Sequence, residues 1–212
     1  DNSGLSKKLS FRIIEELAAS NVRGLIFTGG GEPLCNPYTI DTVKLAKSLG
    51  LEIGFITNGS FLNKDNAESL IKSCTWIRIS LDASNADMFK KTHGMDAKEY
   101  EKILANIRML ADLKKTYGSN CTIGAGYLTS KDTMDGMIET AKVCRHLGIQ
   151  YLQFRPMQIH RGGKFGYHWA DVNNKIEKCL KYSNDGYKVL YSKHKYDMMH
   201  DSKFGRSYEK CY

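Results

Sequence analysis

Short apolar segments alternate with longer segments of helical periodicity along most of the sequence, and this alternation limits the choice of fold. We expect strands at Gly24–Thr28, Glu52–Thr57, Thr75–Leu81, Cys121–Leu128 and Tyr151–Arg155. A helix is expected in each gap between them, and strands joined by helices pair in parallel through right-handed crossovers. The sequence therefore predicts an α/β fold, either a partial or full β/α barrel or a doubly wound sheet.

The expected helices are placed by apolar spacing and by capping residues. Ser10 is the predicted cap of the first helix, and Pro37 is expected in the first turn of the second. Further helices are expected near Lys64–Ser73, Tyr100–Tyr117 and Asp135–Leu147. Beyond Pro156 the alternation weakens to one helix near Asp171–Tyr182 and a polar tail rich in Tyr and His.

Two predicted strands carry one apolar and one polar face. In the third strand Ile77, Ile79 and Leu81 share one face, whereas Arg78, Ser80 and Asp82 share the other. The last strand repeats this pattern, with Leu152 and Phe154 opposite Gln153 and Arg155. A parallel strand covered on both faces is nearly all apolar, so the polar face indicates a cavity inside a barrel.

The residues that follow the strands are more polar than the strands themselves. These ends read Thr28-Gly29-Gly30-Gly31-Glu32-Pro33, Thr57-Asn58-Gly59, Ser80-Leu81-Asp82, Leu128-Thr129-Ser130 and Arg155-Pro156-Met157. Turns and helix caps explain each end singly, but ligands of such folds bind where strands end, so their joint occurrence predicts a shared site. The glycine-rich end suits a ligand with an ammonium and a carboxylate, and it suits phosphate poorly because no Lys or Arg follows within the turn.

From about Ser6 to Met157 the sequence resembles the radical S-adenosylmethionine (SAM) superfamily. The most specific part of the resemblance is Gly30-Gly31-Glu32-Pro33, which corresponds to the motif at the end of the second family strand. In that family the motif contacts the amino group of the methionine moiety of SAM. The resemblance implies a partial (β/α)6 TIM-like barrel with strands 2 to 6 of the family in residues 1–157, and strand 1 and the cluster loop missing or incomplete.

The resemblance also implies further SAM-binding positions. Thr57 and Asn58 match the polar end of the third family strand, and Ser80 and Asp82 match the fourth, where they would reach the ribose. Gly124 falls in the glycine-containing segment along which adenine lies. Arg155 points inward at the end of the last predicted strand, where it could bind SAM or a carboxylate or phosphate of the substrate.

The implied reaction is reductive cleavage of SAM by a 4Fe-4S cluster, which gives a 5'-deoxyadenosyl radical for hydrogen abstraction. The family ligates that cluster through C-x3-C-x2-C before the first helix, and the six cysteines of this sequence contain no such triplet. We therefore expect the sequence to be truncated before Asp1, and these 212 residues to be inactive alone. The family further implies a flavodoxin or ferredoxin as reductant.

Residues 158–212 are expected to form a basic extension. His160 to Tyr212 contain eleven Lys and Arg against six Asp and Glu, which favours an anionic partner or a solvated surface. Cys211 stands where family members with a SPASM or twitch domain begin to ligate an auxiliary 4Fe-4S cluster, which implies truncation after Tyr212 as well. Such members often modify peptides or proteins, whereas others act on sugars, nucleosides or tRNA.

Two other classes of function stay open. The chain could be a non-catalytic β/α module that binds SAM or a protein partner, or a basic nucleic-acid-binding domain, although it has no recognisable nucleic-acid motif. Neither an apolar run long enough to span a membrane nor a signal peptide is present, so a cytoplasmic location is expected, with no membrane partner.

Overall fold

The computed structural model describes residues 4–157 and 166–200, which form one curved parallel sheet with helices on its outer side. The strands are β1 (Gly24–Phe27), β2 (Glu52–Thr57), β3 (Trp76–Ser80), β4 (Thr122–Thr129), β5 (Tyr151–Pro156) and β6 (Lys188–Tyr191). The α-helices are α1 (Lys7–Ala19), α2 (Thr39–Ser48), α3 (Lys64–Ser73), α4 (Ala86–His93), α5 (Ala97–Thr116), α6 (Met137–Leu147), α7 (Trp169–Leu180) and α8 (Lys193–His200). Short 3-10 turns, η1 (Pro33–Cys35) and η2 (Met134–Gly136), precede α2 and α6.

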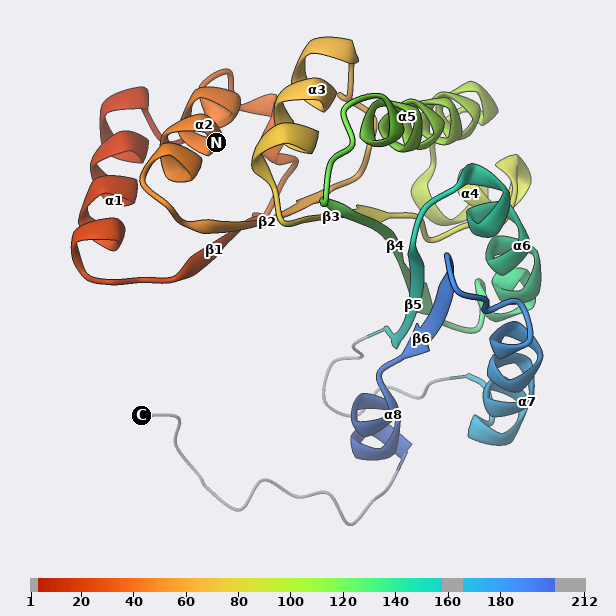
Figure 1. Ribbon diagram of the computed structural model, residues 1–212. Helices are drawn as coiled ribbons and strands as arrows, with labels where there is room; N and C mark the ends of the chain where they lie inside the picture. The colour runs from red at the N-terminus through yellow and green to blue at the C-terminus, as the bar shows by residue number, and fades with distance from the viewer. Residues whose placement is uncertain (1–3, 158–165, 201–212) are drawn as a thin grey trace.

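The strand order decides between the two predicted architectures. All six strands pair in parallel in the order β1-β2-β3-β4-β5-β6, so each strand lies beside its neighbour in sequence. A doubly wound sheet reverses its strand order at a switch point, whereas a β/α barrel does not. The fold is therefore part of a TIM-like barrel wall, with helices α1 to α7 on the convex face and α8 beyond the end of β6 (Figure 1).

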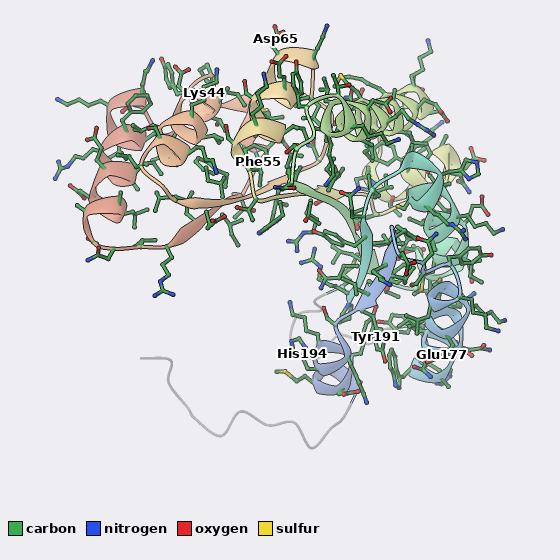
Figure 2. All side chains as sticks on the ribbon, viewed as in Figure 1. Lys44, Phe55, Asp65, Glu177, Tyr191 and His194 are labelled. Carbon is green, nitrogen blue, oxygen red and sulfur yellow. The ribbon has the colours of Figure 1, made fainter. Side chains whose placement is uncertain are left out.

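The core lies between the sheet and the outer helices. Side chains on the convex face of the strands are buried, among them Ile53, Phe55, Ile77, Ile123 and Phe154. Figure 2 shows Phe55 between the sheet and the helix layer, whereas Lys44 and Asp65 project from the outer surface. The alternation predicted for the third and last strands is confirmed, because Ile77, Ile79, Leu152 and Phe154 are buried and the residues between them face the concave side.

Several helix ends differ from the sequence-based expectations. The cap of α1 is Ser6, whose hydroxyl accepts a hydrogen bond from the Leu9 amide at 3.3 Å, while Ser10 is buried inside the helix. The prediction of Ser10 as cap was wrong because apolar spacing locates a helix only from its first buried residues. The first residues of α1, which are exposed, carry no such signal. Helix α2 begins at Thr39, two residues after Pro37.

Two parts of the chain contain more regular structure than predicted. The gap between β3 and β4 holds α4 as well as α5, and Asn85 caps α4 by accepting a hydrogen bond from the Met88 amide at 2.8 Å. Beyond the predicted helix near residues 171–182, which is α7, β6 pairs in parallel with β5, and α8 follows. The predicted domain division at residue 157 stays a prediction. None of the described helices is long and apolar enough to cross a membrane.

Candidate functional site

The loop after β1 is held against the end of β2 by the carboxylate of Glu32. Its Oε1 accepts hydrogen bonds from the Thr57 hydroxyl at 2.8 Å and the Leu34 amide at 3.1 Å, and its Oε2 accepts one from the Asn58 amide at 2.7 Å. The Glu32 carboxylate thus serves as a brace between two strand ends. The brace fixes the residue that directly follows the glycines.

Gly30 and Gly31 leave their backbone groups open. Nothing lies within 4 Å of a Cβ built on either glycine, and both residues are exposed. They line a cavity of about 910 Å³ together with Glu32, Cys35 and Tyr38. A loop of this kind can present backbone carbonyls and amides to an ammonium and a carboxylate, and the contact with such a ligand stays a prediction.

At the end of β2 the side chains of the two predicted site residues are engaged in a turn. The hydroxyl of Thr57 accepts a hydrogen bond from the Gly59 amide at 3.0 Å, and Asn58 Oδ1 accepts one from the Ser60 amide at 2.9 Å. Thr57 is buried and Asn58 is exposed. Asn58 is therefore open to solvent, while Thr57 supports the loop through Glu32.

Ser80 ends β3 half-buried, and Asp82 follows it two residues later on the same side of the chain. Asp82 Oδ1 accepts a hydrogen bond from the Leu128 amide at 2.7 Å, which joins the ends of β3 and β4. Burial raises the pKa of the Asp82 carboxyl, although this hydrogen bond and the charges of His93 and Arg155 oppose the shift. Asp82 Oδ2 accepts no hydrogen bond from the described residues, so one acceptor remains for a ligand.

Glycines on the concave face of the sheet make room for large neighbouring side chains. A Cβ on Gly54 would lie 2.2 Å from the Trp76 ring, and a Cβ on Gly124 would lie 2.2 Å from the Tyr151 ring. The backbone of Gly124 is therefore covered by Tyr151, and a ligand reaches it only if the ring moves. The predicted contact of Gly124 with adenine stays a prediction that requires such a movement.

Above Tyr151 two arginines from different strands converge. A Cβ on Gly126 would lie 3.2 Å from Arg155 Nη2 and 3.6 Å from Arg78 Nε. The guanidinium carbon of Arg78 also lies 5.7 Å from the Trp76 ring centroid. Sequence reasoning placed both arginines on the inner face but assigned a site role only to Arg155. Gly126, which pairs with Ser80 in the sheet, is the signal that could have shown the convergence, because its missing side chain leaves room for both arginines.

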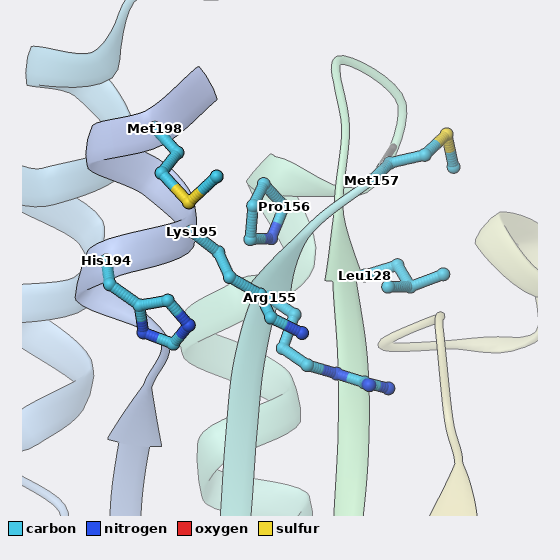
Figure 3. A pocket seen from close by; sticks show the side chains of 7 residues that line it. All are labelled: Leu128, Arg155, Pro156, Met157, His194, Lys195 and Met198. Carbon is cyan, nitrogen blue, oxygen red and sulfur yellow. The ribbon is translucent and has the colours of Figure 1, made fainter. Parts of the chain in front are cut away.

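Arg155 also borders a cavity at the end of β5 (Figure 3). This cavity of about 670 Å³ lies between β5 and α8, and Arg155, Lys195 and His194 supply its charged and polar side chains. The remaining lining residues are Leu128, Pro156, Met157 and Met198. Sequence reasoning missed Lys195 because β6 and α8 were read as a polar tail.

The described residues contain no cluster of His, Cys, Asp or Glu that could hold a metal ion. Of the described cysteines only Cys35 is exposed. Burial raises the pKa of Cys121 to about 11 and the pKa of Cys144 and Cys179 to about 12, and it raises that of Cys74 further. A 4Fe-4S cluster needs accessible thiolates, so these side chains do not fit its ligands. Cys211 lies outside the described residues.

The fold is thus a partial β/α barrel, in which an exposed glycine loop lies beside polar side chains at the strand ends. The family model described as "Radical SAM superfamily" matches residues 3–144, and the chain belongs to this superfamily. Membership implies SAM and a 4Fe-4S cluster as cofactors of the family.

Several curated proteins are similar in sequence. The chain is 34% identical over 86 residues to an S-adenosylmethionine-dependent nucleotide dehydratase of Flammeovirga pacifica, covering 41% of this chain and 29% of that protein. It is 26% identical to an AdoMet-dependent heme synthase of Methanosarcina barkeri, covering 70% and 41% of the two chains, respectively. It is 24% identical to a probable GTP 3',8-cyclase of Saccharolobus solfataricus, covering 85% and 56%. The chain therefore spans between 29% and 56% of the length of these relatives.

Solved structures share the fold at low sequence identity. The crystal structure of Streptococcus suis SuiB bound to S-adenosylmethionine matches with a TM-score of 0.70 at 16% identity, covering 91% of this chain and 44% of SuiB. A domain of pyruvate-formate lyase-activating enzyme from Bacteroides vulgatus matches with a TM-score of 0.62 at 18% identity, covering 80% and 99%. These matches confirm the predicted partial radical SAM barrel.

Proposed function

We propose that this chain is the SAM-binding core of a radical SAM enzyme. The observation that carries the proposal is the Glu32 brace, which holds Gly30 and Gly31 with open backbone groups at the edge of the cavity. A methionine ammonium needs several acceptors in fixed positions, and a braced glycine loop offers them without ordering costs at binding. Membership of the radical SAM superfamily supports the same assignment.

In this proposal the residues of the chain bind and orient SAM. The backbone of Gly30 and Gly31 holds the methionine ammonium, while Ser80 and the free oxygen of Asp82 hold ribose hydroxyls. A reduced 4Fe-4S cluster beside SAM would supply the one electron needed to cleave the S–C5' bond into methionine and a 5'-deoxyadenosyl radical, which would take a hydrogen atom from the substrate. The cluster ligands do not come from the described residues.

Several finer parts of the proposal concern the whole protein. We propose an external reductant such as flavodoxin or ferredoxin, a cytoplasmic location, and an auxiliary 4Fe-4S cluster of the SPASM or twitch type with Cys211 as one ligand. The names of the relatives, a nucleotide dehydratase and a probable GTP cyclase, favour a nucleotide-like substrate over a peptide or sugar. The 16% identity to SuiB supports only the fold.

The experiment that tests SAM binding is calorimetric titration of the purified chain with SAM. Gly31→Val places a branched side chain into open space at the cavity, so it is expected to fold normally and to bind SAM at least about tenfold more weakly. Gly186→Val is the matched control, because Gly186 lies in a turn before β6, far along the chain from this loop. Equal SAM affinity in wild type and Gly31→Val would reject the assignment of the loop.

A second measurement separates the enzyme from a non-catalytic binding module. Anaerobic reconstitution with iron and sulfide, followed by assay for 5'-deoxyadenosine, is expected to give no SAM cleavage by these 212 residues alone. A protein that includes C-x3-C-x2-C upstream is expected to cleave SAM. SAM binding without cleavage in that longer protein would favour the non-catalytic module, and steeply salt-dependent binding of nucleic acid would favour the third class of function.

A further inference from the structure

Two guanidinium groups meet on the concave face of the sheet without a carboxylate between them. The side chains of Arg155 on β5 and Arg78 on β3 both approach Gly126 on β4, the strand between them. No ion pair joins either arginine to an acid anywhere in residues 4–157 and 166–200. The charge of Arg155 interacts with that of Asp82, but Asp82 Oδ1 is already bonded to the Leu128 amide.

This arrangement costs free energy in the absence of an anion. The Nε atoms of Arg78 and Arg155 are both buried, and neither donates a hydrogen bond within the described residues. Burial and the charge of Arg155 lower the pKa of Arg78. A buried, unpaired donor is destabilising, and more so when it carries charge. A fold that retains two such groups side by side gains most when an anion binds between them.

The cationic region continues from Arg155 into the cavity beside α8. Lys195 and His194 border that cavity, and Figure 3 shows them on α8, across the cavity from β5. Arg78 borders a second cavity of about 390 Å³, together with Trp76, Tyr151 and Gln153. Neither cavity has an Asp or Glu among its lining residues.

The position of this region differs from that of the SAM loop. Lys195 and His194 lie beyond residue 144, where the match to the family model ends. Helix α8 is held in place because the buried hydroxyl groups of Tyr196 and Thr129 are hydrogen-bonded at 2.8 Å. The cations therefore belong to the concave face and to an element outside the matched region.

We propose that Arg78, Arg155 and Lys195 form a binding site for the phosphate group of a small-molecule substrate. This proposal adds a substrate class to the proposed function. It depends on the proposed function only for the reaction that would follow substrate binding. A phosphate or diphosphate carries more than one negative charge and several acceptor oxygens, which suits two arginine forks and an ammonium group. A single carboxylate needs only one such fork.

The cavities also indicate where the rest of the substrate would lie. The cavity beside α8 has an apolar wall that includes Leu128, Met157 and Met198, so a phosphate at Arg155 can carry an apolar or planar body into it. The rings of Trp76 and Tyr151 border the cavity of about 390 Å³ together with Arg78. The site thus combines cations with apolar surface, as small-molecule pockets generally do.

The test is titration of the full chain with inorganic pyrophosphate, followed by calorimetry, in parallel with a titration with SAM. Arg78→Gln and Arg155→Gln are each expected to weaken pyrophosphate binding about tenfold or more, because each removes charge-assisted hydrogen bonds. Arg23→Gln is the matched control, since it removes the same charge from an exposed position and is expected to leave affinity within about twofold. Gly126→Ala keeps every charge but adds a methyl group 3.2 Å from Arg155 Nη2, and it is also expected to weaken binding.

The outcomes separate this inference from the proposed function. If pyrophosphate binds but SAM does not, the SAM assignment fails and the phosphate site stands. Three results would reject the phosphate site. Wild type does not bind pyrophosphate, Arg23→Gln weakens binding as much as Arg78→Gln and Arg155→Gln do, or SAM displaces pyrophosphate one for one through its own carboxylate. Thermal unfolding of each variant verifies folding, and Arg155→Lys, which retains the charge without the fork, is expected to recover part of the lost affinity.

Discussion

The Glu32 carboxylate accepts a hydrogen bond of 2.8 Å from the hydroxyl of Thr57, 25 residues away in sequence. Thr57 is buried, and its hydroxyl in turn accepts a hydrogen bond from the Gly59 amide. The two residues therefore couple the glycine loop after β1 to the turn after β2. In this protein the acid of the Gly-Gly-Glu-Pro motif acts on the shape of the site, and the glycine backbone is the part left for a ligand.

The first prediction concerns this brace. Glu32→Ala leaves the Thr57 hydroxyl and the Leu34 and Asn58 amides without their acceptor, so it is expected to lower the free energy of unfolding by about 1–3 kcal/mol and to weaken SAM binding. Glu32→Gln retains one acceptor oxygen and is expected to fall between wild type and Glu32→Ala. Urea unfolding and SAM titration measure both effects. The exposed Glu15→Ala is the control, and a Glu32→Ala protein with unchanged SAM affinity would contradict the brace.

The second prediction uses the pH dependence of Asp82. Because burial raises the pKa of this carboxyl in the folded state, its charge is costly to folding at neutral pH. Acidification through the raised pKa protonates Asp82 in the folded protein first, and the cost is gone below the unfolded value of about 3.9. Asp82→Asn keeps an acceptor for the Leu128 amide and removes the charge.

Asp82→Asn is therefore expected to be at least as stable as wild type at neutral pH, and this advantage is expected to shrink as the pH falls toward about 4. Urea unfolding across that pH range measures the difference. Asp112→Asn, at an exposed position on α5, is the control and is expected to show no such trend. Asp82→Asn becoming relatively more stable on acidification would disprove the assigned direction.

The positions of the first five strands could be predicted because these strands carry their own signals. Ile77 and Ile79 alternate with Arg78 and Ser80, and each strand is followed by a polar end, so strand positions and facing could be inferred locally. Strand β6 was missed because Val189 is its only fully buried residue, and four residues of mixed polarity resemble a loop. Its assignment depends on pairing with β5, which no local pattern encodes.

The site was predictable only in part for the same reason. Gly30, Gly31 and Glu32 form a contiguous motif, so the loop could be located, but the Glu32–Thr57 hydrogen bond joins two separate strand ends. The meeting of Arg78 and Arg155 over Gly126 depends on the register of three strands. Long-range relationships of this kind require the folded structure.

The third prediction concerns thiol reactivity. Because burial raises the pKa of Cys144 to about 12, a far smaller fraction of it than of an ordinary thiol is expected to be thiolate near pH 8. A thiol reagent followed by peptide mapping is expected to label Cys35 quickly and the peptides of Cys121, Cys144 and Cys179 only after denaturant is added. Cys35→Ser removes its own labelling and serves as the control. Rapid labelling of Cys144 in the native protein would be inconsistent with its burial.

The last prediction tests the contact between Gly124 and Tyr151. A Cβ at residue 124 would lie 2.2 Å from the Tyr151 ring, so Gly124→Ala forces the ring to move and is expected to lower the free energy of unfolding by about 1–3 kcal/mol. In a Tyr151→Ala background the same substitution meets no ring and is expected to cost much less. The difference between the two costs, measured by urea unfolding, is the coupling energy of the pair and is expected to exceed about 0.5 kcal/mol. Gly30→Ala, with open space around its Cβ, is the control for the added methyl group.

The same pair of residues affects the predicted contact between Gly124 and adenine. If adenine binds along Gly124, Tyr151→Ala is expected to strengthen SAM binding because the ring no longer has to move. Weaker SAM binding in that variant would instead indicate that the ring itself contacts the ligand.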